Sequence, residues 1–359
     1  MADETRPLDQ ATYSRRQVLG AGLGLAAGVY AAGALPGSRD LMRPVLRPAA
    51  TKWKYAVIPP VVNPFYQPFP GAIRAAEKAF NTGPIAYELP TTFTQDAENV
   101  IVDGLAAKGY NLMAIQPADP EAGNALISRL VGSGIKVVCF GAPPAQPSKA
   151  VFALATDVKV AAYDSALEVI KLIGGKGNIV HFSGDVADAN TVPRVAGVNS
   201  AVAATHGKVK LLQTVTNDDS PSTAPPAVAD VFSAYGTKIN GIVCTAYNPA
   251  AAVSNYLKTH GIHNVKVVGI DTATDTIAAV KAGYLAGTMI QNPYGMCYLS
   301  IYSLKLLSQG YTWKRTSPFF INSGNAFIDK SNVAHWQAAQ AQLTKTLQVK
   351  WKNYFNPPA

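Results

Sequence analysis

The sequence has few of the residues that build covalent or metal-bound frameworks. Among its 359 residues there are three cysteines and five histidines. Cys139, Cys244 and Cys297 lie far apart, each in an apolar run. Such cysteines form no disulfide framework, and scattered histidines provide no structural zinc site. We therefore predict a protein held together by its hydrophobic core, with no metal and no cofactor.

Charged residues are also scarce. Only 15% of the chain is Asp, Glu, Lys or Arg, whereas 48% is hydrophobic, a balance that excludes a disordered chain. The length suits two domains of ordinary size. The net charge is +9, but the basic residues are spread singly along the chain. We interpret them as a solvated surface and expect no nucleic-acid partner.

The compact motifs of common catalytic sites are absent. The sequence has no Gly-x-Ser-x-Gly elbow, no His-Glu-x-x-His pair and no phosphate-binding Gly-x-x-x-x-Gly-Lys-Ser/Thr loop. Asp185 and Asp188 follow a predicted strand with His181 nearby, which suggests metal or acid–base chemistry. The alternative, which we favour, is a polar loop at the rim of a cleft. We predict no catalytic residues and no enzyme activity.

One long apolar run is present, near the N-terminus. The segment Ser14–Leu19 carries a twin arginine, and Val18–Ala34 is uncharged, rich in Gly and Ala, and ends in Ala-Gly-Ala. This pattern is typical of a cleaved secretory signal, and the paired arginines indicate the twin-arginine route. We predict that residues 1–34 are a twin-arginine signal peptide and that the protein is periplasmic. A membrane-anchoring helix is the alternative.

After residue 50, strand-like and helix-like segments alternate. Strands are predicted at Trp53–Ile58, Ile85–Leu89, Leu112–Gln116, Lys136–Phe140, Asn178–Phe182, Lys210–Val215, Gly241–Cys244 and Val265–Ile270. Helices are predicted between them at Gly71–Phe80, Asp96–Lys108, Glu121–Val131, from Asp157 to Ile173, and at Pro193–Thr205, Pro221–Tyr235 and Pro249–His260. This alternation indicates α/β architecture, with parallel sheets covered by helices on both faces. The number of strands suits two doubly wound sheets.

Polar-proline pairs mark points where predicted strands give way to helices. They are Asn63-Pro64, Asp119-Pro120, Ser220-Pro221, Asn248-Pro249 and Asn292-Pro293. A polar N-cap side chain accepts a free backbone N–H, and proline suits the first helical position. These helices would begin beside the carboxyl ends of strands, the edge where open α/β sheets bind ligands. The alternative that a pair is only a cap stays open, and Ser220 is assigned no function.

Short motifs also recur in a fixed order. They are Asn63-Pro64-Phe65-Tyr66, Gln116-Pro117-Ala118-Asp119, Ala155-Thr156-Asp157, the helix start Asn190-x-x-x-Arg194-x-x-Gly197, Val267-Val268-Gly269-Ile270-Asp271, and Gln291. In order and spacing they resemble the motifs of periplasmic sugar-binding proteins of the ribose-binding type, the ABC transporter substrate-binding proteins. The resemblance covers Lys52 to Lys330, nearly the whole chain after the predicted signal.

The resemblance implies two doubly wound parallel-sheet lobes joined by a three-strand hinge, the type I periplasmic binding protein fold. It assigns residues 51–154 and 289–316 to an N-terminal lobe and residues 155–288 and 317–330 to a C-terminal lobe. Residues 331–359 are predicted to form a C-terminal helical extension. A sugar or polyol is expected to bind between the lobes, and an ABC permease in the membrane to recognise the closed form of a monomeric receptor.

The resemblance also implies a set of ligand-binding residues. Asp271 and Arg194 are expected to hydrogen-bond neighbouring hydroxyls, and Phe65 and Tyr66 to offer flat faces to a sugar ring. The full set is Asn63, Phe65, Tyr66, Asn190, Arg194, Asn217, Tyr247, Asn248, Asp271 and Gln291. The alternatives are a structural ion pair or cap for Asp271 and Arg194, a cap alone for Asn63, and core packing for the two aromatics.

The sequence departs from the family pattern at the end of the fourth strand. Family members that bind pyranoses commonly carry Asp-Arg there, where this chain has Phe140–Pro143. The ligand is then expected to be smaller, less hydroxylated, or held by other groups. Candidate substitutes are Asn217, Asp218, Tyr247 and Asn248.

The tail after Lys330 is also additional to the family pattern. Ala334–Leu347 has helical composition, with Trp336, Leu343 and Leu347 on one approximate stripe. We expect this helix to pack on a lobe, with a partner-binding helix as the alternative.

Three other functions are weighed against a transport receptor. A transcriptional regulator of the same fold would need an N-terminal helix-turn-helix, where residues 1–50 offer only a signal. A secreted enzyme whose cofactor is loaded before export would need a catalytic constellation. A sensor that presents the ligand to a membrane receptor is not separable from a transport receptor by sequence.

Overall fold

The structure is a computed structural model that describes residues 53–358. The predicted signal peptide, residues 1–34, lies outside the described residues. None of the described helices combines the length and apolar character that a membrane crossing requires.

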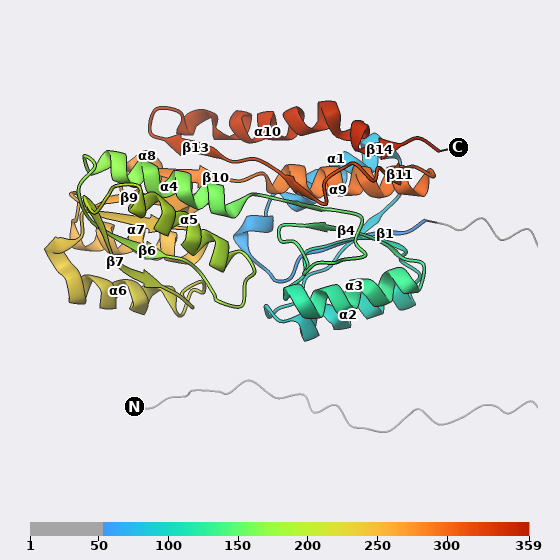
Figure 1. Ribbon diagram of the computed structural model, residues 1–359, viewed down its shortest axis with the longest axis horizontal. Helices are drawn as coiled ribbons and strands as arrows, with labels where there is room; N and C mark the ends of the chain where they lie inside the picture. Colours follow the sequence, from blue (N-terminus) through green and yellow to red (C-terminus); the bar gives the residue numbers. More distant parts are fainter. Residues whose placement is uncertain (1–52, 359) are drawn as a thin grey trace, which may run out of the picture. The chain divides into compact units, whose positions relative to one another are not determined.

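The described residues build two α/β lobes, each on a six-stranded sheet (Figure 1). The sheet of the N-terminal lobe has the strand order β12-β5-β4-β3-β1-β2, and its neighbouring strands are parallel. Its strands are β1 (Tyr55–Ile58), β2 (Ile85–Tyr87), β3 (Leu112–Ile115), β4 (Lys136–Phe140), β5 (Ala153–Ala155) and β12 (Phe320–Asn322). Strands such as β1 and β3 are buried along their whole length because helices cover both faces of the sheet.

The sheet of the C-terminal lobe has the order β13-β10-β9-β8-β6-β7. Its strands are β6 (Gly177–Phe182), β7 (Val209–Val215), β8 (Gly241–Cys244), β9 (Lys266–Ile270), β10 (Gly287–Ile290) and β13 (Ala326–Asp329). Strand β13 pairs antiparallel with β10, and the other pairs are parallel. The two sheets confirm the predicted fold class, two doubly wound lobes.

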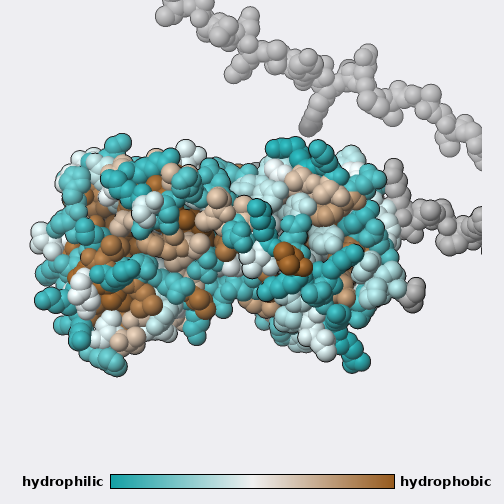
Figure 2. All heavy atoms as spheres, turned by 90° about the horizontal axis from the view of Figure 1, so that it is seen from above, coloured by the Kyte–Doolittle hydropathy of each residue, from teal (hydrophilic) through white to brown (hydrophobic). Residues whose placement is uncertain are grey.

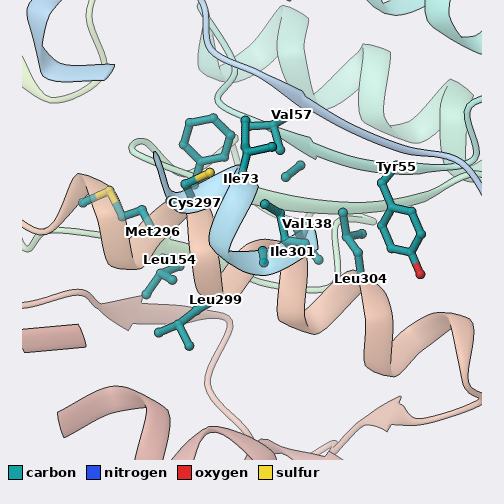
Figure 3. Close-up of a cluster of buried hydrophobic side chains, with 14 of the residues drawn as sticks. Tyr55, Val57, Ile73, Val138, Leu154, Met296, Cys297, Leu299, Ile301 and Leu304 are labelled. Atoms are coloured by element: carbon teal, nitrogen blue, oxygen red, sulfur yellow. The ribbon is translucent and has the colours of Figure 1, made fainter. Parts of the chain in front are cut away.

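Helices cover both faces of each sheet. The helices are α1 (Phe69–Phe80), α2 (Gln95–Ala107), α3 (Pro120–Gly132), α4 (Val158–Leu172), α5 (Thr191–Ala203), α6 (Ala224–Tyr235), α7 (Tyr247–His260), α8 (Thr274–Ala282), α9 (Pro293–Ser308) and α10 (Trp336–Trp351). In the N-terminal lobe, α9 contributes Met296, Leu299 and Ile301 to a core that also receives Val57 and Ile73 (Figure 3). The opposite face packs on α2 and α3.

The chain passes between the lobes three times, as the resemblance implied: after β5, after β10, and between β12 and β13. The crossings bond to one another, because Asn292 Nδ2 donates to the Ser323 carbonyl at 3.1 Å and Thr156 Oγ1 lies 3.1 Å from Ser323 Oγ. The second and third crossings lie at other residues than expected. Strand β10 pairs within the C-terminal sheet and β12 within the N-terminal sheet, so each return lies a few residues later than the boundaries at 289 and 317. Strand pairing, which a linear motif does not encode, decides this.

Two of the five predicted helix caps are wrong. Helix α6 begins at Ala224, and the Ser220 hydroxyl accepts from the Thr223 N–H at 3.0 Å in the preceding turn. Helix α7 begins at Tyr247, with Asn248 inside its first turn and no side-chain cap. The Asn248 amide instead bonds Asp219 on a neighbouring loop, a tertiary contact that overrides the local capping preference.

The C-terminal helix α10 lies along both lobes (Figure 1). Its first turns pack Trp336 and Ala339 against the core of the C-terminal lobe, and Leu347 and Trp351 join the core of the N-terminal lobe. The chain end then pairs as β14 (Phe355–Asn356) with β11 (Thr312–Trp313), which follows α9. Figure 2 looks onto this side of the molecule, where hydrophilic and hydrophobic side chains are intermixed.

The middle of α10 lies over the hinge. Gln340 Nε2 donates to the Gln291 carbonyl at 3.0 Å, and the Thr344 hydroxyl donates to Asn292 Oδ1 at 2.8 Å. The buried face of the helix therefore includes two polar residues, which an apolar stripe does not predict. The expectation that the extension packs on one lobe understates its position, since it contacts both.

Candidate ligand-binding cleft

A cavity of about 560 Å³ lies between the two lobes. Its walls are loops that follow strands at their carboxyl ends, from β1 to β4 in one lobe and from β6 to β10 in the other. The carboxyl ends of parallel strands share one edge of each sheet, so the two edges face the same cavity. The cavity thus has the position at which open α/β sheets bind ligands.

The wall from the N-terminal lobe is largely apolar and carries aromatic side chains. Asn63 caps a 3₁₀ turn, Pro64–Tyr66, by accepting the Phe65 N–H at 2.9 Å. The turn brings Phe65 and Tyr66 together, with ring centroids 5.1 Å apart in a T-shaped arrangement. Phe93, from the loop after β2, also lines this side. Aromatic faces of this kind suit the C–H surface of a ring or carbon chain.

Gln116 and Gly141, which follow β3 and β4, line the same side of the cavity. The buried Tyr66 hydroxyl donates to Gln116 Oε1 at 2.9 Å, and burial raises the pKa of Tyr66, so the phenol stays protonated. Gly141 has a φ of +68°, and a β-carbon there would collide with the Gln116 amide. Glycine at this position, directly after β4, therefore makes room for the neutral Gln116 amide.

The wall from the C-terminal lobe is polar and charged. Arg194 Nη1 lies 3.2 Å from Asp188 Oδ2, and the Arg194 side chain is only 11% exposed. Asp271, which follows β9, accepts from Gln291 Nε2 at 2.8 Å. Burial raises the pKa of Asp271 to about 6, although the Gln291 bond and the Arg194 charge lower it. Asp271 is therefore mostly ionised at neutral pH, and Arg194 pairs directly with Asp188 rather than with Asp271.

Two more carboxyl groups lie on adjacent loops of this wall. Asp219 Oδ1 accepts from the Asn248 backbone N–H at 3.0 Å and from Asn248 Nδ2 at 2.9 Å. The Asp219 N–H in turn donates to Asp185 Oδ1 at 3.4 Å. Burial raises the pKa of Asp185, and the charge of Asp219 raises it further. The loops after β6, β7 and β8 are thereby tied into one acidic surface.

The structure brings together all the predicted site residues except Asn217. Those that line the cavity are Asn63, Phe65, Tyr66, Asn190, Arg194, Tyr247, Asn248, Asp271 and Gln291. Asn190 Nδ2 also reaches across to the Gly141 carbonyl of the other lobe at 3.4 Å. The Tyr247 hydroxyl donates to Asp275 Oδ2 at 2.8 Å.

Asn217 is the exception. Its side chain is exposed and accepts the Val186 N–H at 3.1 Å outside the cavity lining. Asp218, the neighbouring candidate, is fully buried and accepts the Gly184 N–H at 2.8 Å. The residue of this loop that lines the cavity is Asp219. In a tight turn a shift of one residue reverses the direction of a side chain, which sequence spacing alone does not resolve.

Sequence reasoning missed other lining residues. Those with polar or aromatic side chains are Thr91, Phe93, Gln116, Asp185, Asp188, Asp219 and Ser220, the last of which was assigned no function from the sequence. Asp185 and Asp188 do form the polar loop expected at the cleft rim, and they also line the cavity. The available signal was position: each of these residues follows the carboxyl end of a strand.

His181 does not contribute a charge to this site. It is fully buried with Nε2 2.8 Å from Thr245 Oγ1, and burial lowers its pKa to about 3, helped by the Arg194 charge. It is neutral at ordinary pH. Over residues 53–358 there is no group of three or more His, Cys, Asp or Glu side chains suited to holding a metal ion.

Comparison with known proteins agrees with this architecture. A family model described as the periplasmic binding protein domain matches residues 55–312, most of the chain. The chain belongs to this family. The fold of the periplasmic binding protein domain is also seen in an ABC transporter solute-binding protein from Burkholderia graminis, solved with D-arabinose. That structure is 24% identical, has a TM-score of 0.72, and covers 80% of this chain and 98% of its own.

Two further proteins are similar to this chain. A solute-binding protein from Agrobacterium vitis, solved with D-fucose, is 23% identical with a TM-score of 0.72, and covers 80% of this chain and 99% of its own. A xylitol-binding protein of Mycolicibacterium smegmatis is 27% identical over 191 residues, 53% of this chain and 54% of the relative. The match therefore spans about half of that relative's length. At these identities the solved structures show the fold.

Proposed function

We propose that the protein is an extracytoplasmic receptor that binds a sugar or polyol between its lobes and delivers it to an ABC importer. The observation that carries this proposal is the cavity itself, where an aromatic wall from one lobe faces a wall of carboxylates and amides from the other. Hydroxyl groups donate to carboxylates and amides, while the carbon skeleton packs on aromatic faces. The xylitol-binding relative and the pentose- and fucose-bound structures support the same ligand class.

The hinge gives the receptor its mechanism. Three crossings connect the lobes, so a rotation about them opens or closes the cavity without breaking either sheet. A ligand that contacts both walls favours the closed state by its differential affinity. We propose that a monomer in this closed state is what an ABC permease recognises. A binding protein of this kind needs no catalytic residue and no cofactor.

The test is thermal unfolding of the exported protein against pentoses, hexoses and alditols. A ligand at about 100 times its Kd adds about 2.7 kcal/mol to the free energy of unfolding, which raises Tm by several degrees. Asp271→Ala or Arg194→Ala should abolish the shift. Asp103→Ala, at an exposed ion pair with Arg129, is the matched control and should keep it. The absence of any shift with sugars and polyols at millimolar concentration, both neutral and amino-substituted, contradicts the proposal.

We also propose that the protein reaches the periplasm by the twin-arginine route. Arg15 and Arg16 precede the apolar run as that pathway requires. Replacing both by lysine should leave unprocessed protein in the cytoplasm, as cell fractionation would show. Export that is unchanged by this replacement contradicts the route.

A further inference from the structure

The cleft carries a charge opposite to that of the whole chain. The chain has a formal net charge of +9, yet the charged residues lining the cavity are Asp185, Asp188, Asp219, Asp271 and Arg194. Arg194 is matched by Asp188 at 3.2 Å. The other three carboxyl groups take part in no ion pair with any residue of the described part of the chain.

Each of these three carboxyl groups has an uncommitted oxygen. Asp271 Oδ1 accepts from Gln291, Asp219 Oδ1 from Asn248, and Asp185 Oδ1 from the Asp219 N–H. Within residues 53–358, the second oxygen of each carboxyl group has no hydrogen-bond partner. None of these three oxygens is among the fully buried atoms that lack a partner. Three acceptors therefore remain for a ligand in the cavity.

The carboxyl groups also repel one another. Burial is the main cause of the raised pKa of Asp185 and Asp271, and the negative charge of Asp219 raises both further. The bond from the Asp219 N–H lowers the pKa of Asp185, and the Gln291 bond and the Arg194 charge lower that of Asp271, without cancelling the rise. Hydroxyl groups offer only dipoles to such a surface, whereas a positive charge relieves the repulsion directly. A bare metal ion is not the favoured cation, because the described residues contain no metal-holding group.

We infer that the ligand is an amino sugar or amino polyol, whose protonated amino group faces Asp185, Asp219 and Asp271. This inference rests on the proposed function and names the ligand class of the same cleft. The amides of Gln116, Asn190 and Gln291 hydrogen-bond the ligand's hydroxyl groups, and the aromatic side chains of the other wall pack on its carbon skeleton. A sugar acid is disfavoured, since its carboxylate would add to the uncompensated negative charge.

The experiment compares matched ligands by isothermal titration calorimetry at pH 7.5. Each neutral hexose or alditol is paired with analogues that carry an amino group at C1, C2, C3 or C6, and with the corresponding sugar acid. The best amino analogue should bind roughly tenfold or more tightly than its neutral parent, and this ratio should shrink in high salt. The sugar acid should bind more weakly than the parent.

A variant identifies the source of the preference. Asp219→Asn keeps an oxygen that can accept from Asn248, so the loop contact is retained while the charge is removed. The ratio of amino-analogue to parent affinity should fall several-fold in this variant. Asp103→Asn makes the same charge change at an exposed site outside the cavity and should leave the ratio unchanged.

The outcomes separate the two proposals. If neutral sugars bind as tightly as their amino analogues or more tightly, the inference is overturned while the receptor function stands. If amino analogues bind more tightly but Asp219→Asn does not lower the ratio, the assigned carboxylates are wrong. If no compound of either type binds, both the receptor function and the inference fall.

Discussion

Glu98 lies at the base of the loop that carries Gln116. Its side chain has no exposed surface, and Oε2 accepts from Gln95 Nε2 at 2.8 Å and from the Ala118 N–H at 3.1 Å. Burial raises the pKa of Glu98 from 4.5 to about 8, although both hydrogen bonds lower it. The carboxyl group is thus protonated, and so neutral, at neutral pH. It holds the loop after β3 through the bond from the Ala118 N–H.

A raised carboxyl pKa sets the sign of a pH effect. The folded state binds the Glu98 proton more tightly than the unfolded state, so the free energy of unfolding falls as pH rises from about 4.5 to about 8. Glu98→Gln replaces the acid by a permanently neutral group and should remove this decline. Urea unfolding at pH 5, 7 and 9 should show the variant gaining on the wild type as pH rises. A difference that stays constant over this range would contradict the assignment.

At the scale of elements, α10 is fixed at its C-terminal end by Trp351. The side chain is fully buried, donates from Nε1 to Ser303 Oγ at 2.8 Å on α9, and meets Phe152 edge to face at 5.7 Å. One residue thus joins the extension to the core of the N-terminal lobe.

Truncating Trp351 should be costly. Trp351→Ala leaves a cavity and removes the hydrogen bond that Ser303 Oγ accepts, and should lower the free energy of unfolding by about 3–5 kcal/mol, as denaturant titration would measure. Val349→Ala, at a position 89% exposed on the same helix, is the control and should change it by less than about 0.5 kcal/mol. Equal effects of the two substitutions would mean that α10 does not pack as described.

At the scale of the whole described structure, residues 53–358 form two lobes with separate cores. The clusters under the N-terminal sheet and those under the C-terminal sheet share no residue. The three crossings bond to one another, and α10 packs against both cores. The hinge is therefore a bonded layer rather than a set of loose linkers.

We expect the lobes to unfold together for this reason. Scanning calorimetry of the ligand-free protein should give one transition, with a calorimetric enthalpy equal to the van't Hoff enthalpy. Two resolved transitions would show that the crossings and α10 do not couple the lobes. A ligand that contacts both walls should raise the single transition as a whole.

The residues of the candidate site could be predicted from the sequence where they follow the carboxyl end of a strand. Asn63, Arg194 and Asp271 could be placed at the cavity from the sequence because each lies in a motif or at a helix start next to the carboxyl end of a strand. Asp219 was missed in favour of Asn217, because the turn after β7 decides which side chain reaches the cavity. Phe93 was missed because a lone aromatic in a loop carries no pattern of its own.

The sequence by itself determined the alternation of strands and helices, the two-lobe fold and the edge at which the site lies. The alternation and the edge follow from local periodicity and capping, which neighbouring residues encode. The two-lobe fold follows from the number of strands and from the resemblance carried by the ordered motifs. Only the tertiary structure decided that β12 and β13 join different sheets and that Arg194 pairs with Asp188. It alone also decided that Gln340 and Thr344 turn a polar face of α10 toward the hinge. Such contacts join residues far apart in the chain, and their energies depend on burial and partners that no local pattern records.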